Sequence, residues 1–171
     1  KGVCFDTGGL DIKCATGRRN MRKDMGGAAH ALALARLIMC QNLPIRLSLL
    51  IPAVENAIAG NAFRPGEVIK TRQGITVEID NTDAEGRLIL CDALHYAKQY
   101  DPEWVVDVAT LTGACVVALG SVASGLYVNN EALHDAIQTA SVATNEKVWR
   151  MPLFDEYKAL LKGTHADLLN I

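Results

Sequence analysis

The residues best suited to chemistry lie in one short segment, Asn-Thr-Asp-Ala-Glu-Gly-Arg-Leu at positions 81–88. It brings Asp83, Glu85 and Arg87 close together, between a run typical of a strand and a run typical of a helix. Carboxylates this close repel each other, so a cation must offset their charge. Arg87 is one candidate for that cation and a cluster of metal ions is the other. Acidic residues elsewhere in the chain favour the metal ions.

Two of those acidic residues stand beside glycine pairs. Asp6 ends a predicted strand and precedes Gly8-Gly9, while Asp24 precedes Gly26-Gly27. Taken singly, each is best interpreted as a turn residue or a helix cap, which is the common role of Asp before glycine. Asp83 could likewise cap the helix that follows it. A shared site therefore depends on the whole set, and strand ends in α/β sheets are where such sets meet.

Lys1 and Lys13 flank Asp6, and each would ordinarily be a solvated surface charge. A lysine beside metal ions loses its proton more readily, because nearby positive charge disfavours the ammonium form. A neutral amine could then bind a metal ion, whereas a charged lysine could polarise a carbonyl group. The sequence alone leaves both roles open.

The composition excludes several classes of protein. The net charge of −2 argues against nucleic-acid or anionic-membrane binding, and no apolar run has the roughly 20 residues of a membrane span. The five cysteines form no Cys-x-x-Cys pair and mostly have apolar neighbours, which predicts buried free thiols in a reducing compartment. The four histidines form no metal-binding pair, which argues against a histidine-rich zinc site.

Apolar strands alternate with helices along the chain, which predicts an α/β fold with a mixed, mostly parallel sheet between helices. We expect one domain. The predicted strands are 3–5, 45–51, 68–71, 75–79, 105–108 and 125–128, with a hairpin turn at 72–74. The predicted helices are 28–40, 84–98, 112–119, 131–144 and 154–162, and we expect the helix at 84–98 to be largely buried.

Taken together, these motifs strongly resemble the M17 leucyl aminopeptidase (cytosol aminopeptidase) family. The octapeptide at 81–88 matches that family's signature. The resemblance runs in register over the whole chain, through the segments 2–13, 21–29, 110–114 and 149–153. It implies that residues 1–171 are part of the family's C-terminal catalytic domain, without the N-terminal domain and without the end of the catalytic domain. The chain starts in a strand already under way, which fits this expectation.

The resemblance also implies a site with two divalent metal ions, Mn²⁺ or Zn²⁺, with Mg²⁺ as a further alternative. One ion is expected on Lys1, Asp6, Asp24 and Glu85, and the other on Asp6, Asp83 and Glu85. Lys13 is expected to polarise the scissile carbonyl, and Arg87 to hold a bicarbonate that accepts a proton from the attacking water. The expected substrate-binding residues are Met21, Thr110, Leu111 and Gly113.

The activity so implied is removal of N-terminal residues from peptides, with leucine-like residues favoured. The family forms cytoplasmic homo-hexamers, each a dimer of trimers, so the same assembly and location are expected of the full-length protein. Two other functions stay open at this point. One is DNA binding, which some bacterial members of the family perform, although the net charge gives it no support. The other is phosphoester hydrolysis, since two-metal carboxylate sites also serve phosphoryl transfer.

Overall fold

The computed structural model describes all 171 residues, which form two compact units. The first unit comprises Lys1–Leu111 and Leu161–Ile171, and the second comprises Thr112–Leu160. The first unit holds β1 (Gly2–Asp6), α1 (Ala15–Arg18), η1 (Met21–Met25), α2 (Gly26–Cys40), β2 (Ala53–Asn56), β3 (Val68–Lys70), β4 (Thr76–Glu78), α3 (Gly86–Ala97), η2 (Lys98–Tyr100) and β7 (Leu168–Leu169). The second holds α4 (Gly113–Leu119), β5 (Ser124–Leu126), α5 (Glu131–Thr144), β6 (Val148–Arg150) and most of the 3₁₀ helix η3 (Asp155–Leu161).

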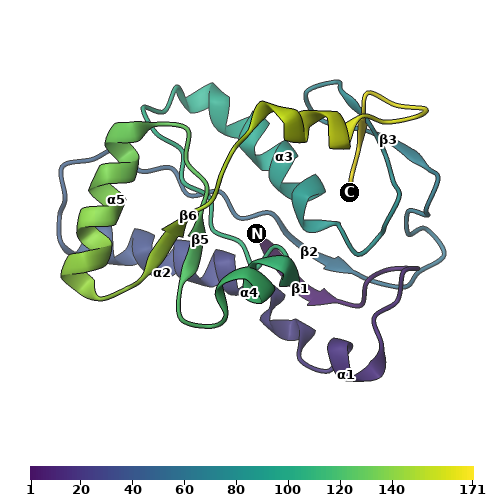
Figure 1. The fold of residues 1–171 in the computed structure, drawn as a ribbon, viewed down its shortest axis with the longest axis horizontal. Coiled ribbons are helices and arrows are strands. Elements are labelled where there is room, and N and C mark those ends of the chain that lie inside the picture. The colour runs from purple at the N-terminus through teal and green to yellow at the C-terminus, as the bar shows by residue number, and fades with distance from the viewer. The chain divides into compact units, whose positions relative to one another are not determined.

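The parallel pair β1–β2 is the part of the first unit that positions the site (Figure 1). The pairing runs from Gly2 opposite Ala53 to Asp6 opposite Asn56, with an irregularity between Val3 and Phe5. Parallel strands end at the same edge of a sheet, so the side chains of Asp6 and Asn56 emerge together. Val3, at the centre of β1, is fully buried.

The hairpin of β3 and β4 is antiparallel, as predicted, and its turn contains Gly74 at a φ of 96°. β7 adds to β4 in parallel, pairing Val77 with Leu168. This small sheet leads through the fully buried Ile79 into the segment that carries Asp83 and Glu85.

The predicted helices at 28–40, 84–98, 112–119 and 131–144 are confirmed as α2, α3 with η2, α4 and α5. The expectation that the helix at 84–98 is largely buried is wrong. Within α3 only Gly86 and Leu90 are buried, whereas Leu94 and Tyr96 are each 37% exposed. The segment predicted as a helix at 154–162 contains the 3₁₀ helix η3.

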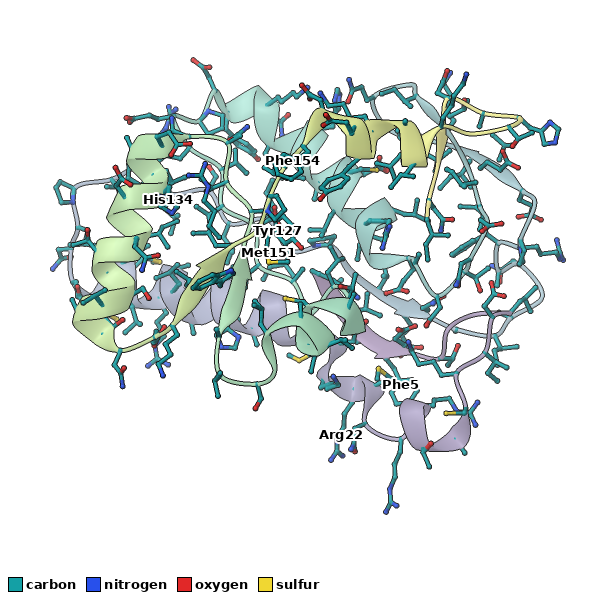
Figure 2. All side chains as sticks on the ribbon, in the orientation of Figure 1. Phe5, Arg22, Tyr127, His134, Met151 and Phe154 are labelled. Carbon is teal, nitrogen blue, oxygen red and sulfur yellow. The ribbon has the colours of Figure 1, made fainter.

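The second unit contains a β–α–β arrangement (Figure 1). β5 and β6 pair in parallel, with Ser124 opposite Val148, and α5 connects them. The side chain of Asn130 accepts a hydrogen bond from the Leu133 amide at 2.9 Å, which caps the start of α5. Tyr127 and Met151 follow directly after the two strands (Figure 2).

Two predicted strands are wrong. Residues 45–51 form no strand; β1 pairs instead with the residues after Pro52, and the Gly2 amide donates to the Pro52 carbonyl at 3.2 Å. Residues 105–108 also form no strand. One hydrogen bond joins them to the residue before β1, from the Lys1 α-amino nitrogen to the Val108 carbonyl at 2.9 Å, and a β-ladder needs repeated hydrogen bonds.

The five cysteines are free thiols, but the expectation of their burial is wrong, since three are exposed and two are half-buried. None of the helices combines the length and apolarity that crossing a bilayer requires. The α/β class is confirmed, and parallel strand pairs occur in both units.

Candidate metal centre

Four carboxylates and two lysines from distant parts of the first unit meet in one place. We call this set the carboxylate–lysine cluster; its members are Asp6, Asp24, Asp83, Glu85, Lys1 and Lys13. Asp6 is the last residue of β1, Asp24 lies in η1, and Glu85 directly precedes α3. The side chain of Arg22, two residues before Asp24, projects outward from η1 (Figure 2), whereas Asp24 is only 5% exposed.

Lys1 lies between two buried carboxylates. Its Nζ is 2.9 Å from Asp24 Oδ2 and 3.1 Å from Glu85 Oε1, and it donates to the Thr110 carbonyl at 3.2 Å. The side chain passes over Gly86, where an added Cβ would lie 2.6 Å from Lys1 Cε. A Cβ at position 86 would push the end of this lysine side chain away from its present place between the two carboxylates.

Lys13 binds the other two carboxylates. Its Nζ is 3.1 Å from Asp6 Oδ2, and 2.6 Å and 2.8 Å from the two carboxylate oxygens of Asp83. Burial by itself lowers the pKa of Lys13, but its hydrogen bonds to Asp83 and Asp6 and their negative charges together raise that pKa above its ordinary value. Lys13 therefore carries a positive charge in this environment.

The segment around residues 80–84 is held in place by side chains from two other parts of the chain. Asp11 accepts from the Thr82 amide at 2.7 Å, and the Asp11 amide donates to the Thr82 hydroxyl at 2.9 Å. On the other side, the buried Asn170 accepts from the Asp80 amide at 2.8 Å and donates to the Asn81 carbonyl at 2.7 Å. These bonds fix the backbone that carries Asp83 and Glu85.

Several carboxylates of the cluster use their two oxygens differently. Asp6 Oδ1 accepts from the Gly8 amide and from Asn56, both at 2.9 Å, and Asp24 Oδ1 accepts from the Thr110 hydroxyl at 2.9 Å. The opposite oxygens point at the lysines. Among these, Asp24 Oδ2, Asp83 Oδ1 and Glu85 Oε1 are buried atoms that lie near an ammonium group but receive no well-directed hydrogen bond.

The cluster lacks positive charge. Its four carboxylates outnumber its two lysines, which leaves two negative charges in excess in a mostly buried place. Burial raises the pKa of Glu85 and of Asp83, and the attraction of the neighbouring lysines does not cancel that effect. Buried excess charge of this kind is stabilised by an added cation.

The donor set fits divalent metal ions. Asp6, Asp83 and Glu85 each offer a carboxylate oxygen, and these oxygens lie within 4.8 Å of one another. Asp24 Oδ2, which receives no well-directed hydrogen bond, adds a fourth carboxylate oxygen. Together these atoms form a hard, oxygen-rich ligand set that suits Mn²⁺ or Mg²⁺ and also accommodates Zn²⁺.

The other predicted site residues have varied positions. Arg87 is half-buried and forms no ion pair. The cations that offset Asp83 and Glu85 are Lys13 and Lys1, so the alternative in which Arg87 offsets these carboxylates is wrong. Met21 begins η1 and is half-buried, Thr110 contacts the cluster, and Leu111 is 43% exposed. Gly113 is the first residue of α4, in the second unit.

Sequence reasoning missed four polar residues that support the cluster, namely Asp11, Asn56, Thr82 and Asn170. Asn56 lies at the carboxyl end of β2, so a correctly placed strand would have drawn attention to it. Asn170 acts across a sequence separation of about 90 residues, and no local pattern predicts such a contact.

The fold and this cluster together define an α/β protein with a buried centre suited to divalent cations. The model of the cytosol aminopeptidase family, catalytic domain, matches residues 1–171. The chain belongs to the cytosol aminopeptidase family.

Individual relatives agree with this assignment. The chain is 52% identical over 171 residues to a probable cytosol aminopeptidase of Dechloromonas aromatica. The alignment covers 100% of this chain and 34% of that protein. It is also 52% identical, over 172 residues, to one of Chlorobium limicola, with the same coverage. The chain thus spans about a third of the length of these curated relatives.

Solved structures share the fold. The crystal structure of a cytosol aminopeptidase from Coxiella burnetii matches with a TM-score of 0.94 and 55% identity, over 98% of this chain and 37% of that one. The bottromycin maturation enzyme BotP, solved in complex with Mn, matches with a TM-score of 0.94 and 39% identity, over 99% of this chain and 38% of that one.

Proposed function

We propose that this chain is part of the catalytic domain of a dinuclear metal-dependent aminopeptidase, which releases N-terminal residues from peptides and favours leucine-like side chains. The observation that carries the proposal is the carboxylate–lysine cluster, with its excess negative charge and its buried oxygens that lack directed hydrogen bonds. The names of the relatives support the reaction class, and the Mn in the BotP structure supports the choice of a divalent ion.

Two divalent ions would share the carboxylates of the cluster. The residues that would hold one of them are Lys1, Asp6, Asp24 and Glu85, and those for the other are Asp6, Asp83 and Glu85. When bound, such a pair supplies Lewis acidity toward a water molecule and a peptide carbonyl. Asp6 and Glu85 would serve both ions, and their carboxylates lie close together, since the Asn56 amide hydrogen-bonds to both.

The chain's own residues would complete the reaction. Lys13, which lies beside Asp6 and Asp83, would present a charged donor to the oxygen that becomes negative during attack on the carbonyl. Arg87, which forms no ion pair, would be free to hold a bicarbonate that accepts the proton of the attacking water. The proposed contacts for the substrate's N-terminal residue are Met21, Thr110, Leu111 and Gly113.

The proposal extends to the whole protein. We infer that it is cytoplasmic, that it assembles as a homo-hexamer, and that an N-terminal domain and the end of the catalytic domain accompany residues 1–171. The chain's coverage of about a third of its relatives supports the last point. Neither DNA binding nor phosphoester hydrolysis gains support from the comparisons.

A pair of matched substrates tests the proposed function. The full-length protein would be stripped of metal with a chelator, and its hydrolysis of leucine p-nitroanilide measured before and after addition of Mn²⁺. We expect activity only with Mn²⁺, and none on N-acetyl-leucine p-nitroanilide, whose amine is blocked. Equal hydrolysis of both anilides, or hydrolysis of p-nitrophenyl phosphate alone, would show that the proposed reaction is wrong.

A further inference from the structure

We propose that Asn56 is a positioning residue that sets the separation of the Asp6 and Glu85 carboxylates and thereby controls how two metal ions bind as a pair. This inference rests on the proposed function, in which those two carboxylates serve both ions. It concerns a residue outside the expected ligand set, at the end of the strand that the sequence did not predict.

The side-chain amide of Asn56 lies between the two carboxylates. Its Nδ2 carries two hydrogens, which it shares among three acceptors: Asp6 Oδ1 at 2.9 Å, the Thr82 carbonyl at 3.0 Å and Glu85 Oε2 at 3.3 Å. All three neighbours of this nitrogen are acceptors, which fixes the orientation of the amide. Asn56 is only 5% exposed, so water does not compete for these bonds.

These bonds determine which oxygens remain for metal ions. Asp6 has Oδ1 bound to Asn56 and Oδ2 directed at Lys13, while Glu85 has Oε2 bound to Asn56 and Oε1 directed at Lys1. One amide group thus holds one oxygen of each carboxylate and leaves the other oxygen facing a cation. Supporting hydrogen bonds of this kind orient metal ligands and tune their affinity.

The side chain of Asn56 is not needed to hold its own strand. The Asn56 carbonyl already accepts from the Thr7 amide at 3.0 Å and from the Thr7 hydroxyl at 2.7 Å, and register pairing places it beside Asp6. The side-chain amide hydrogen-bonds to the two carboxylates and to the Thr82 carbonyl. A purely structural role at the end of a strand would not require bonds to the carboxylates.

Asn170 provides a matched control within the same unit. It is also a buried asparagine, at 2% exposure, and it also holds the segment that carries Asp83 and Glu85. Its side-chain hydrogen bonds go to backbone groups of Asp80, Asn81 and Ala84, and none goes to a carboxylate. Replacing either asparagine should therefore weaken the support of this segment, whereas only replacing Asn56 should disturb the positions of the carboxylates.

The test uses Asn56→Leu and Asn170→Leu in the full-length protein, with Asn56→Ser as a smaller change in case the leucine variant does not fold. Circular dichroism and the melting temperature report folding, titration with Mn²⁺ reports affinity and stoichiometry, and electron paramagnetic resonance reports whether two Mn²⁺ ions are spin-coupled. We expect folded Asn56 variants to lose about 10- to 100-fold in Mn²⁺ affinity at one site or more, with a loss of the coupled signal.

The Asn170→Leu variant should melt at a lower temperature yet retain the coupled Mn²⁺ signal. The inference is overturned if a folded Asn56 variant binds two Mn²⁺ ions with wild-type affinity and spectrum, or if Asn170→Leu loses the coupled signal equally. Wild-type protein that binds no Mn²⁺ would instead overturn the proposed function, and this inference with it, so the two failures are distinguishable.

Discussion

The lysines of the cluster explain how so many carboxylates can be buried together. Lys1 is 7% exposed and Asp6 is 3% exposed, and burying either charge alone would be strongly unfavourable. Pairing lowers that penalty, but each lysine is shared by two carboxylates, so two negative charges remain in excess. At the scale of residues, the cluster is therefore better suited to holding cations than to stabilising the fold by itself.

The first prediction concerns the carboxylates. Asp83→Asn or Glu85→Gln in the full-length protein should lower the amount of bound Mn²⁺ below the wild-type value and abolish hydrolysis of leucine p-nitroanilide, because each change removes an anionic ligand while keeping the side chain's shape. Elemental analysis after dialysis measures the metal. Asp80→Asn is the control, since Asp80 is exposed and lies in the same segment. Unchanged metal content in both variants would return Asp83 and Glu85 to the role of helix-capping residues.

The second prediction separates the two lysines. Lys13→Met should lower kcat by about 10²- to 10³-fold with little change in metal content, because a donor to the developing oxyanion acts mainly in the transition state. Lys1→Met should instead weaken metal binding, since Lys1 faces Asp24 and Glu85. Steady-state kinetics together with metal analysis distinguish these outcomes. Equal metal loss in both variants would contradict the role assigned to Lys13.

At the scale of elements, the sequence predicted what depends on local pattern. The β3–β4 hairpin and the helices α2, α3, α4 and α5 follow from periodicity and turn residues, and Asp6 was correctly placed at the end of β1. The predicted strand at 45–51 followed from an apolar run, whereas β1 pairs with residues 53–56 after Pro52. Because of that error, Asn56 was not recognised as the last residue of a strand, which is the position where functional residues of α/β sheets gather.

The third prediction concerns the attachment of the chain's last segment to the hairpin. Glu78 accepts from the amides of Thr164 and His165 at 2.8 and 2.9 Å, and Asp167 accepts from the Thr76 amide and hydroxyl at 2.8 and 2.7 Å. These hydrogen bonds lower the pKa of both carboxyl groups. Their stabilising effect is therefore fully present above the ordinary pKa of about 4, and it is lost progressively as the pH falls from there through the lowered pKa of the folded state.

We accordingly expect the melting temperature to fall on acidification from pH 6 toward pH 3, and to fall less steeply in the double variant Glu78→Gln, Asp167→Asn. The variant should already melt at a lower temperature at pH 6, because the amide side chains accept more weakly than carboxylates. Glu103→Gln serves as the control, since Glu103 is an exposed acidic residue of the same unit. Parallel pH profiles for the double variant and wild type would contradict this explanation.

At the scale of the whole molecule, all the proposed metal ligands belong to the first compact unit, although they are spread from Lys1 to Glu85. Metal binding should therefore connect segments of this unit that are far apart in sequence. The final prediction is that Mn²⁺ stabilises the full-length protein against unfolding. At a free concentration 100-fold above its dissociation constant, an ion that binds only the folded state adds about 2.7 kcal/mol.

Thermal unfolding with Mn²⁺ and with chelator measures this effect, and hydrogen exchange locates it. Protection should be greatest at amides in segments 6–13 and 80–86, where the carboxylates and the backbone that holds them lie. The Asp83→Asn, Glu85→Gln double variant should show neither the gain in melting temperature nor the added protection. Equal stabilisation of that variant by Mn²⁺ would mean that the ion binds elsewhere, and that the excess charge of the carboxylate–lysine cluster is not what draws it to the protein.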